Sequence, residues 1–142
     1  MSEADCLFCK IVAGEIPCTE IYSTDTVLAF LDIAPVNKGH ALVIPKVHQE
    51  NIFELDSALG ADLTRAMKIA GKAIMQTVGA DGLNIGMNNH AAAGQLIFHA
   101  HFHLIPRFEN DGLSLWPQEP VSDFDALAAL GQEIRQTIRT IA

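Results

Sequence analysis

Histidines and apolar residues alternate in one short stretch of this chain, IFHAHFHLIPR at residues 97–107. Side chains of a β-strand point to opposite faces in turn, so the alternation predicts a strand over 96–106 with two unlike faces. One face carries His99, His101 and His103 at spacings of about 6.5–7 Å, and the other carries apolar residues suited to a core. Thr, Lys or Glu would serve a solvated face equally well. Three imidazoles in succession therefore favour a functional cluster over a polar surface.

Imidazole offers three chemistries at such a cluster. It ligates metals, transfers protons near neutral pH, and acts as a nucleophile. A row of three rings on one strand does not by itself form a tetrahedral metal site, because metal ligands usually converge from different elements. The row better suits an arrangement in which one ring attacks a substrate while its neighbours orient it or move protons.

The remaining pattern predicts an α+β fold. Strand-like runs and helical periodicities follow one another, with Gly and Pro between them. Short strands are expected at 20–23, 26–33, 39–45 and 82–88, a short helix at 4–13, a long helix at 57–78, and a C-terminal helix that begins with the capping-box pattern SDFD at 122–125. Strands interrupted by one long helix predict a mainly antiparallel five-stranded sheet with that helix and a C-terminal helix, in a single domain over 1–142.

Composition narrows the classes of partner. A chain of 142 residues that is 49% hydrophobic suits one compact domain with a real core. A formal charge of −8 disfavours binding to a nucleic-acid backbone. No stretch approaches the roughly 20 apolar residues of a membrane span, and the first residues do not resemble a signal peptide. We therefore expect a soluble, cytoplasmic protein without nucleic-acid or membrane partners.

Two of the three cysteines, Cys6 and Cys9, form a C-x-x-C pair. Taken alone, this pair is a redox couple, half of a metal site, or two buried thiols. A redox couple of the thioredoxin kind requires a preceding strand and a helix N-terminus, and that context is not evident here. So few cysteines also argue against a disulfide scaffold.

Several segments together resemble the histidine triad family. GQLIFHAHFHLIPR resembles its signature, His-x-His-x-His followed by two apolar residues, and three further segments resemble its nucleotide-binding segments, in the same order: FLDIAP (30–35), GHALVIPKVH (39–48) and NIGMNNHAAAGQ (84–95). The resemblance runs from about Cys6 to Arg107 and is nearest to the bacterial Hit and Hint-like branch. Residues 109–142 form a less diagnostic C-terminal extension.

The resemblance implies a nucleotide hydrolase or transferase. His101 would be the nucleophile at the α-phosphorus of a nucleotide that carries an amine, acyl or phosphate leaving group. A nucleotidyl-histidine intermediate would form, and water would then release a nucleoside monophosphate. The attacking nitrogen must be unprotonated, so the other ring nitrogen should donate to a nearby acceptor, often a backbone carbonyl. His103 and His40 would lie beside the phosphate, with His99 in the same catalytic cluster.

The same resemblance implies a set of substrate contacts with purine nucleotides such as AMP conjugates. The implied contacts are Asp32 with the ribose hydroxyls, Phe30 and Ile33 with the base, Asn88 and Gln95 with phosphate oxygens, and Gly94 as the point where backbone N–H groups approach the phosphate. Leu96 stands where the family often has a polar residue, so the resemblance implies that a hydroxyl donor to the phosphate or leaving group is missing here.

The resemblance also implies structural zinc. Some bacterial members carry a closed Cys₂His₂ site with this N-terminal cysteine pair, and the match places it at Cys6, Cys9, His48 and His99. The alternative leaves both thiols unligated, with His99 serving the catalytic cluster alone. A homodimer is implied as well, with the long helix and a neighbouring strand as its interface.

Three other functions stay open. A dinucleoside polyphosphate hydrolase would need more cations than Lys38, Lys46 and Arg107 offer near the motifs. A zinc-stabilised nucleotide-binding or partner-binding protein would not need a nucleophile. A redox protein built on Cys6 and Cys9 would undergo thiol–disulfide exchange.

Overall fold

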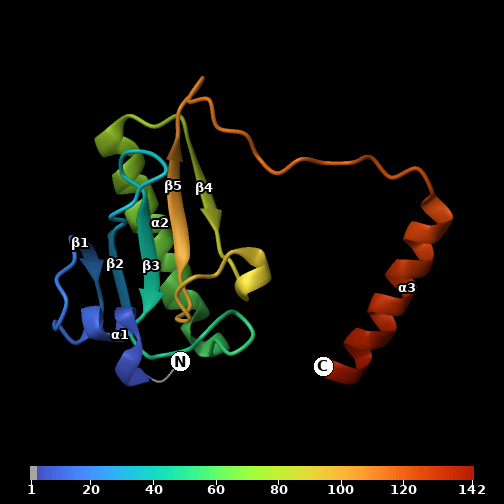
Figure 1. The fold of residues 1–142 in the computed structure, drawn as a ribbon, viewed down its shortest axis with the longest axis horizontal. Helices are drawn as coiled ribbons and strands as arrows, with labels where there is room; N and C mark the ends of the chain where they lie inside the picture. The colour runs from blue at the N-terminus through green and yellow to red at the C-terminus, as the bar shows by residue number, and fades with distance from the viewer. Residues whose placement is uncertain (1–2) are drawn as a thin grey trace. The chain divides into compact units, whose positions relative to one another are not determined.

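The computed structural model describes residues 3–142 and divides into two compact units, one ending at Asp111 and the other spanning Gly112–Ala142. The first unit holds a five-stranded sheet in which every neighbouring pair is antiparallel (Figure 1). Its strands are β1 (Glu20–Ser23), β2 (Val27–Leu31), β3 (Ala41–Pro45), β4 (Gly82–Gly86) and β5 (Phe102–Arg107), in the order β1-β2-β3-β5-β4. The predicted α+β class is confirmed. The predicted organisation of residues 1–142 as one domain stays a prediction.

In this unit, the long helix follows a capped 3₁₀ turn and ends at a glycine. α1 spans Leu7–Val12, and α2 spans Gly60–Val78 after a 3₁₀ turn at Ser57–Leu59. The Asp56 carboxylate accepts a hydrogen bond from the Ala58 N–H at 2.9 Å and so caps that turn. Gly79 ends α2 with a left-handed φ of 69°, as the sequence predicted.

The two faces of the sheet bury two separate sets of apolar side chains. Val27 and Ala29 of β2 pack in one core cluster with residues of α2, whereas Leu28 and Phe30 pack in the other with Phe8 of α1. This is the alternation expected of a strand buried on both faces. α2 therefore covers one face of the sheet (Figure 1). The opposite face carries α1.

The strand predicted over 96–106 is wrong in its first half. β5 begins only at Phe102, and residues 97–99 form a bend. The residues just before β5 do not pair with β3. The Ala100 N–H donates instead to the Gln49 carbonyl at 2.6 Å. Of the three histidines in the pattern, only His103 lies on the strand. The expected row of rings along one strand face is therefore broken.

The second unit contains α3 (Phe124–Ile141). The sequence placed the helix start within SDFD, and the observed cap is Asp123, whose carboxylate accepts from the Ala126 N–H at 2.9 Å. No residue of α3 is buried. Among residues 3–142, none of the helices combines the length and apolarity needed to cross a membrane.

Candidate active site

The middle histidine, His101, is buried and held in one tautomer. Its Nδ1 lies 2.6 Å from the carbonyl oxygen of His99. A carbonyl only accepts, so Nδ1 carries the ring proton and Nε2 keeps a free lone pair. The ring of Phe8 meets the His101 ring edge-on, with centroids 5.2 Å apart and an interplanar angle of 87°. The acceptor that a nucleophilic His101 would require is thus supplied by its own chain, two residues earlier.

A backbone N–H fixes the tautomers of the two neighbouring histidines. The Val36 N–H donates to Nδ1 of His40 at 3.0 Å, so the proton of neutral His40 sits on Nε2. Nε2 of His40 lies 2.9 Å from Nδ1 of His103. His40 is therefore the donor and His103 the acceptor. Neutral His103 must carry its own proton on Nε2, at the far end of the chain of donors.

Burial keeps these rings neutral. It lowers the pKa of His40 and of His101 below the ordinary value of 6.5, because the interior disfavours the charged imidazolium. The pKa of His103 falls to about 4, first through burial and then through repulsion from His101 and His40. Nearby Asp32 opposes all three shifts without cancelling them. Neutral imidazoles are the forms that the tautomer assignment requires.

Asp32 combines a turn role with a place at this cluster. Its Oδ1 accepts from the Ala34 N–H at 2.8 Å, and its Oδ2 lies 3.6 Å from Nε2 of His40. Possible ligand atoms of Asp32, His40 and His103 lie within 4.8 Å of one another. This cluster does not fit a metal ion, however, because the Val36 N–H holds the proton of His40 on the very nitrogen that would ligate.

The two residues implied as base contacts lie in different surroundings. Ile33 is fully exposed shortly after the end of β2, where a flat base can reach it. Phe30 is only 4% exposed and packs edge-on against Phe8 with centroids 5.6 Å apart. The structure therefore places Phe30 in the core. That position favours a supporting role for Phe30 beneath the site.

The loop at residues 88–97 contains the three residues implied as phosphate contacts. Gly94 has a φ of 90°, a conformation that side chains disfavour, and a Cβ built there would lie 3.5 Å from Nδ2 of Asn88. Gln95 is 2% exposed, and its side chain bonds to backbone groups. Leu96 is 84% exposed. The exposed Leu96 side chain thus offers no hydroxyl donor at this position, as the sequence implied.

The four predicted metal ligands converge, with their ligand atoms within 4.8 Å of one another. Nδ1 of His99 lies 3.4 Å from Sγ of Cys6 and 3.6 Å from Sγ of Cys9, and Nδ1 of His48 lies 3.3 Å from Sγ of Cys9. Tetrahedral zinc with Zn–S of about 2.3 Å and Zn–N of about 2.0–2.1 Å has S···N edges of about 3.5 Å. The donor set therefore fits zinc in both kind and spacing.

A second set of contacts supports the same fit. Nε2 of His99 lies 2.8 Å from the Pro45 carbonyl oxygen, so Nε2 carries the proton and Nδ1 points its lone pair at the thiols. The pKa of the Cys9 thiol rises to about 12, through burial and the neighbouring Cys6. A bound divalent cation reverses that shift, because it stabilises the thiolate directly.

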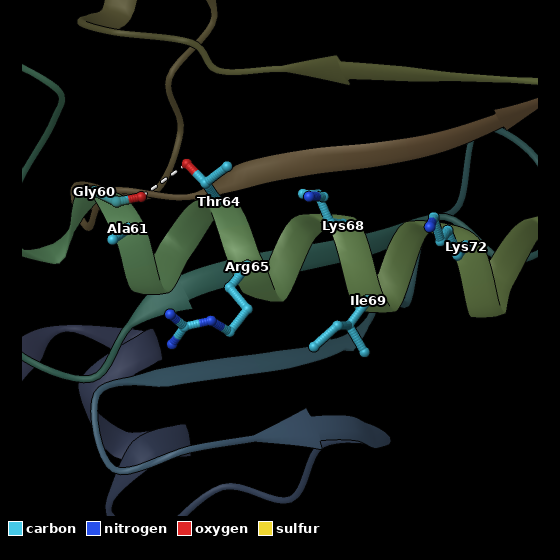
Figure 2. A pocket seen from close by; sticks show the side chains of 7 residues that line it. All are labelled: Gly60, Ala61, Thr64, Arg65, Lys68, Ile69 and Lys72. Carbon is cyan, nitrogen blue, oxygen red and sulfur yellow. Dashed lines mark hydrogen bonds between the residues drawn. The ribbon is translucent and has the colours of Figure 1, made fainter.

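A hollow elsewhere on the surface is not part of this site. It has a volume of about 520 Å³, and Figure 2 shows that a single stretch of α2 lines it, with the side chains of Thr64, Lys68 and Lys72 on one side and Arg65 on the other. None of its lining residues belongs to the histidine or cysteine clusters. The candidate active site instead lies where β3, β5, α1 and the loop before β5 meet.

Sequence reasoning expected an acceptor such as a backbone carbonyl beside His101 but could not identify it, and it missed the other backbone groups that orient the rings. The Val36 N–H and the carbonyls of Pro45 and His99 set the tautomers of His40, His99 and His101, respectively. A backbone group has no signature in the sequence, so no pattern could have revealed these three. Phe8 carried a signal only as an apolar residue of a short helix.

Comparison with known proteins places the chain in a family. The HIT domain model matches residues 13–110. The chain belongs to the histidine triad family. An adenosine 5'-monophosphoramidase from Schizosaccharomyces pombe is 46% identical over 136 residues, which cover 94% of this chain and 98% of the relative. The predicted class, a histidine triad nucleotide hydrolase, is confirmed at this level.

Two solved structures extend the comparison within the histidine triad family. A protein from Streptococcus mutans has a TM-score of 0.91 and 45% identity, covering 96% of this chain and 87% of that one. A zinc-bound histidine triad protein from Mycobacterium smegmatis has a TM-score of 0.69 and 34% identity, covering 93% and 99%. The five-stranded fold derived above is therefore the fold of known family members.

Proposed function

We propose that this protein hydrolyses nucleoside phosphoramidates and related nucleotidyl conjugates at the α-phosphate, releasing a nucleoside monophosphate such as AMP. The observation that carries the proposal is the free Nε2 lone pair of His101, fixed by the 2.6 Å contact of Nδ1 with the His99 carbonyl. Pure binding does not need a buried, neutral nucleophile. The relative from Schizosaccharomyces pombe, an adenosine 5'-monophosphoramidase, supports the choice of substrate class.

The proposed reaction takes two displacements at phosphorus. Nε2 of His101 forms a bond to the α-phosphorus, and the bond from phosphorus to the leaving group breaks. The leaving group departs with the electron pair and takes a proton from water. A second water then attacks phosphorus and breaks the bond to Nε2, giving up one proton to solvent. Neutral His101 and the nucleoside monophosphate are the products.

The donor chain from Val36 through His40 ends at Nε2–H of His103. Each link points the same way, so the bonds polarise one another and strengthen the last donor. Because neutral His103 holds a single ring proton, its role here is to donate a hydrogen bond to a phosphate or leaving-group oxygen or nitrogen. That bond offsets the charge that develops in the transition state.

One of the three cations that could bind a dinucleoside polyphosphate, Arg107, is already paired within the protein. Arg107 donates from Nε and Nη2 to the Asp111 carboxylate at 2.7 and 3.0 Å, and from Nη1 to Asn84 at 2.7 Å. A guanidinium committed in this way is not free to bind a polyphosphate tail. The geometry therefore favours conjugates with a single phosphate over dinucleoside polyphosphates.

Zinc at Cys6, Cys9, His48 and His99 belongs to the same proposal. The donor set and its S···N spacings support it, and so does the existence of a zinc-bound relative in Mycobacterium smegmatis. The ion would supply a closed structural link and no open position for water. Metal content of the purified protein, measured by mass spectrometry, tests this part: about one zinc per chain is expected, and metal-free protein of full stability would contradict it.

A homodimer and a cytoplasmic location complete the proposal. β4 is an edge strand with Ile85 half-exposed, an arrangement that invites pairing with another chain. Light scattering during size exclusion tests the dimer, and a monomer at all concentrations would contradict it. Fractionation of the source cells tests the location.

Activity is tested with a fluorogenic adenosine phosphoramidate. Wild-type protein should turn it over, and His101→Ala should lose about 10³-fold or more in kcat while still binding AMP. Equal activity of the two proteins would refute the proposal. Binding of AMP by the wild type without turnover of any adenylyl conjugate would favour a nucleotide-binding protein instead.

A further inference from the structure

Gln95 lies in the loop at 88–97 with every hydrogen-bonding hydrogen engaged inside the protein. Its side-chain nitrogen donates to the Glu50 carbonyl at 2.6 Å and to the Ile97 carbonyl at 3.1 Å. Its side-chain oxygen accepts from the His90 N–H at 2.8 Å. A primary amide has two hydrogens, so both are used.

The backbone of Gln95 is engaged as well. Its N–H donates to the His90 carbonyl at 3.1 Å. A phosphate oxygen bound by Gln95 would have to displace one of these buried bonds. Leaving a buried partner unsatisfied costs about 1–3 kcal/mol. The hydrogen-bond pattern thus differs from the phosphate contact that the family resemblance implied for Gln95.

The Gln95 amide instead joins two segments that are far apart in the sequence. Besides its bond to Glu50, two further bonds link the same segments: the Ile52 N–H donates to Oδ1 of Asn89 at 2.8 Å, and the Ala100 N–H donates to the Gln49 carbonyl at 2.6 Å. Ala100, the donor of the last bond, lies between His99 and His101 in the sequence. The connection therefore reaches the peptide unit that contains the His99 carbonyl, the acceptor for Nδ1 of His101.

We propose that Gln95 is a positioning residue for His101. The amide holds residues 95–100 against residues 49–52, and this fixes the His99 carbonyl that keeps Nδ1 of His101 protonated. The loop before β5 has no strand ladder to hold it, so this side chain replaces the missing backbone pairing. The inference rests on the proposed function, in which His101 is the nucleophile.

Two substitutions separate positioning from phosphate binding. Gln95→Met keeps the length of the side chain and removes all of its side-chain hydrogen bonds. Gln95→Glu keeps the shape, but a carboxylate cannot donate to two carbonyls. Protonation of that carboxyl restores one donor. The ionisable residues that the amide touches, Glu50 and His90, meet it through their backbone atoms. Gln76→Glu, at an exposed position of α2, makes the same change of charge outside the site.

If Gln95 positions His101, its substitution should lower kcat but leave the affinity for AMP nearly unchanged. Gln95→Met should lose about 10-fold or more in kcat, with Kd for AMP within about threefold of wild type. Gln95→Glu should be impaired near neutral pH and should recover part of its kcat as the pH falls towards about 5. Gln76→Glu should match the wild type. If Gln95→Met cannot be purified folded, the recovery of Gln95→Glu at low pH carries the test.

A spectroscopic measurement does not depend on turnover. The Nδ1 proton of His101, bound to a carbonyl at 2.6 Å, should give a downfield ¹H NMR resonance in wild type and in Gln76→Glu. In Gln95→Met that resonance should shift upfield or broaden. An unchanged resonance together with a Kd for AMP raised about 10-fold would make Gln95 a phosphate ligand and overturn the inference. If the wild-type protein shows no turnover, the proposed function is contradicted. The resonance of the His101 Nδ1 proton still tests the role of Gln95 in that case.

Discussion

Lowering the pH tests whether the active-site histidines work as neutral rings. Burial lowers the pKa of His40, and burial with two neighbouring imidazoles lowers the pKa of His103 to about 4. The donor chain that ends at Nε2–H of His103 exists only while Nδ1 of His103 and Nδ1 of His40 keep their lone pairs. Protonation of either ring therefore breaks the chain.

The size of the effect follows from these values. At about pH 5, a group with a pKa of about 4 is roughly 9% protonated, whereas an ordinary histidine with a pKa of about 6.5 is roughly 97% protonated. The active fraction at that pH thus differs about 30-fold between the two cases. We expect the acid limb of kcat/KM to lie below the ordinary histidine pKa of about 6.5, because burial lowers the pKa of His40, His101 and His103 alike.

The assay is kcat/KM for an adenosine phosphoramidate against pH, with an enzyme-free blank at each pH for spontaneous hydrolysis. A limb with an apparent pKa of about 6.5 or above would refute the reasoning. The free energy of unfolding provides a second check. The unfolded chain binds more protons than the native one below about pH 6.5, so the stability that buried His103 contributes above that pH is lost as the pH falls towards about 4.

Three substitutions test other parts of the site. Gly94→Ala should lower stability by about 1–2 kcal/mol, as should Gly14→Ala, because both positions have left-handed φ. Only the first should also lower kcat/KM, and equal kinetics for the two would contradict a phosphate-loop role. Cys9→Ser should lose bound zinc. At a free zinc concentration about 100 times Kd, this loss should lower the free energy of unfolding by about 2.7 kcal/mol. The control Cys18→Ser should keep both the zinc and the stability. Unchanged metal content in Cys9→Ser would exclude the site. Asp32→Asn keeps an oxygen for the Ala34 turn, so it should lose preference for ribose over 2′,3′-dideoxyribose substrates without unfolding; an unchanged preference would remove the ribose role.

Local patterns predicted the elements of the fold well. The α+β class, the long helix with its Gly79 terminus, and four of the five strands follow from periodicity and turn residues. The strand predicted over 96–106 was wrong in its first half for a reason that the sequence does not show. Alternation marks which side chains face inward, but it does not say whether a neighbouring strand is present to pair with the backbone.

The sequence predicted which histidine and cysteine side chains come together, but not which backbone groups orient them. Histidines 40, 101 and 103 do meet, and the cysteine pair does converge with His48 and His99. What could not be predicted is why each ring is oriented as it is. The Val36 N–H and the Pro45 and His99 carbonyls decide the tautomers, and such groups exist at every residue of every chain. Their roles appear only when the fold brings them to a ring.

The most direct test of the account is to trap the covalent intermediate. Wild-type protein is mixed with an adenosine phosphoramidate, quenched within a turnover, digested under non-acidic conditions and sequenced by mass spectrometry. The account predicts AMP on His101 in the peptide that contains residues 97–107, and no adduct in His101→Ala. AMP on another residue, or His101→Ala turning over at the wild-type rate, would contradict it.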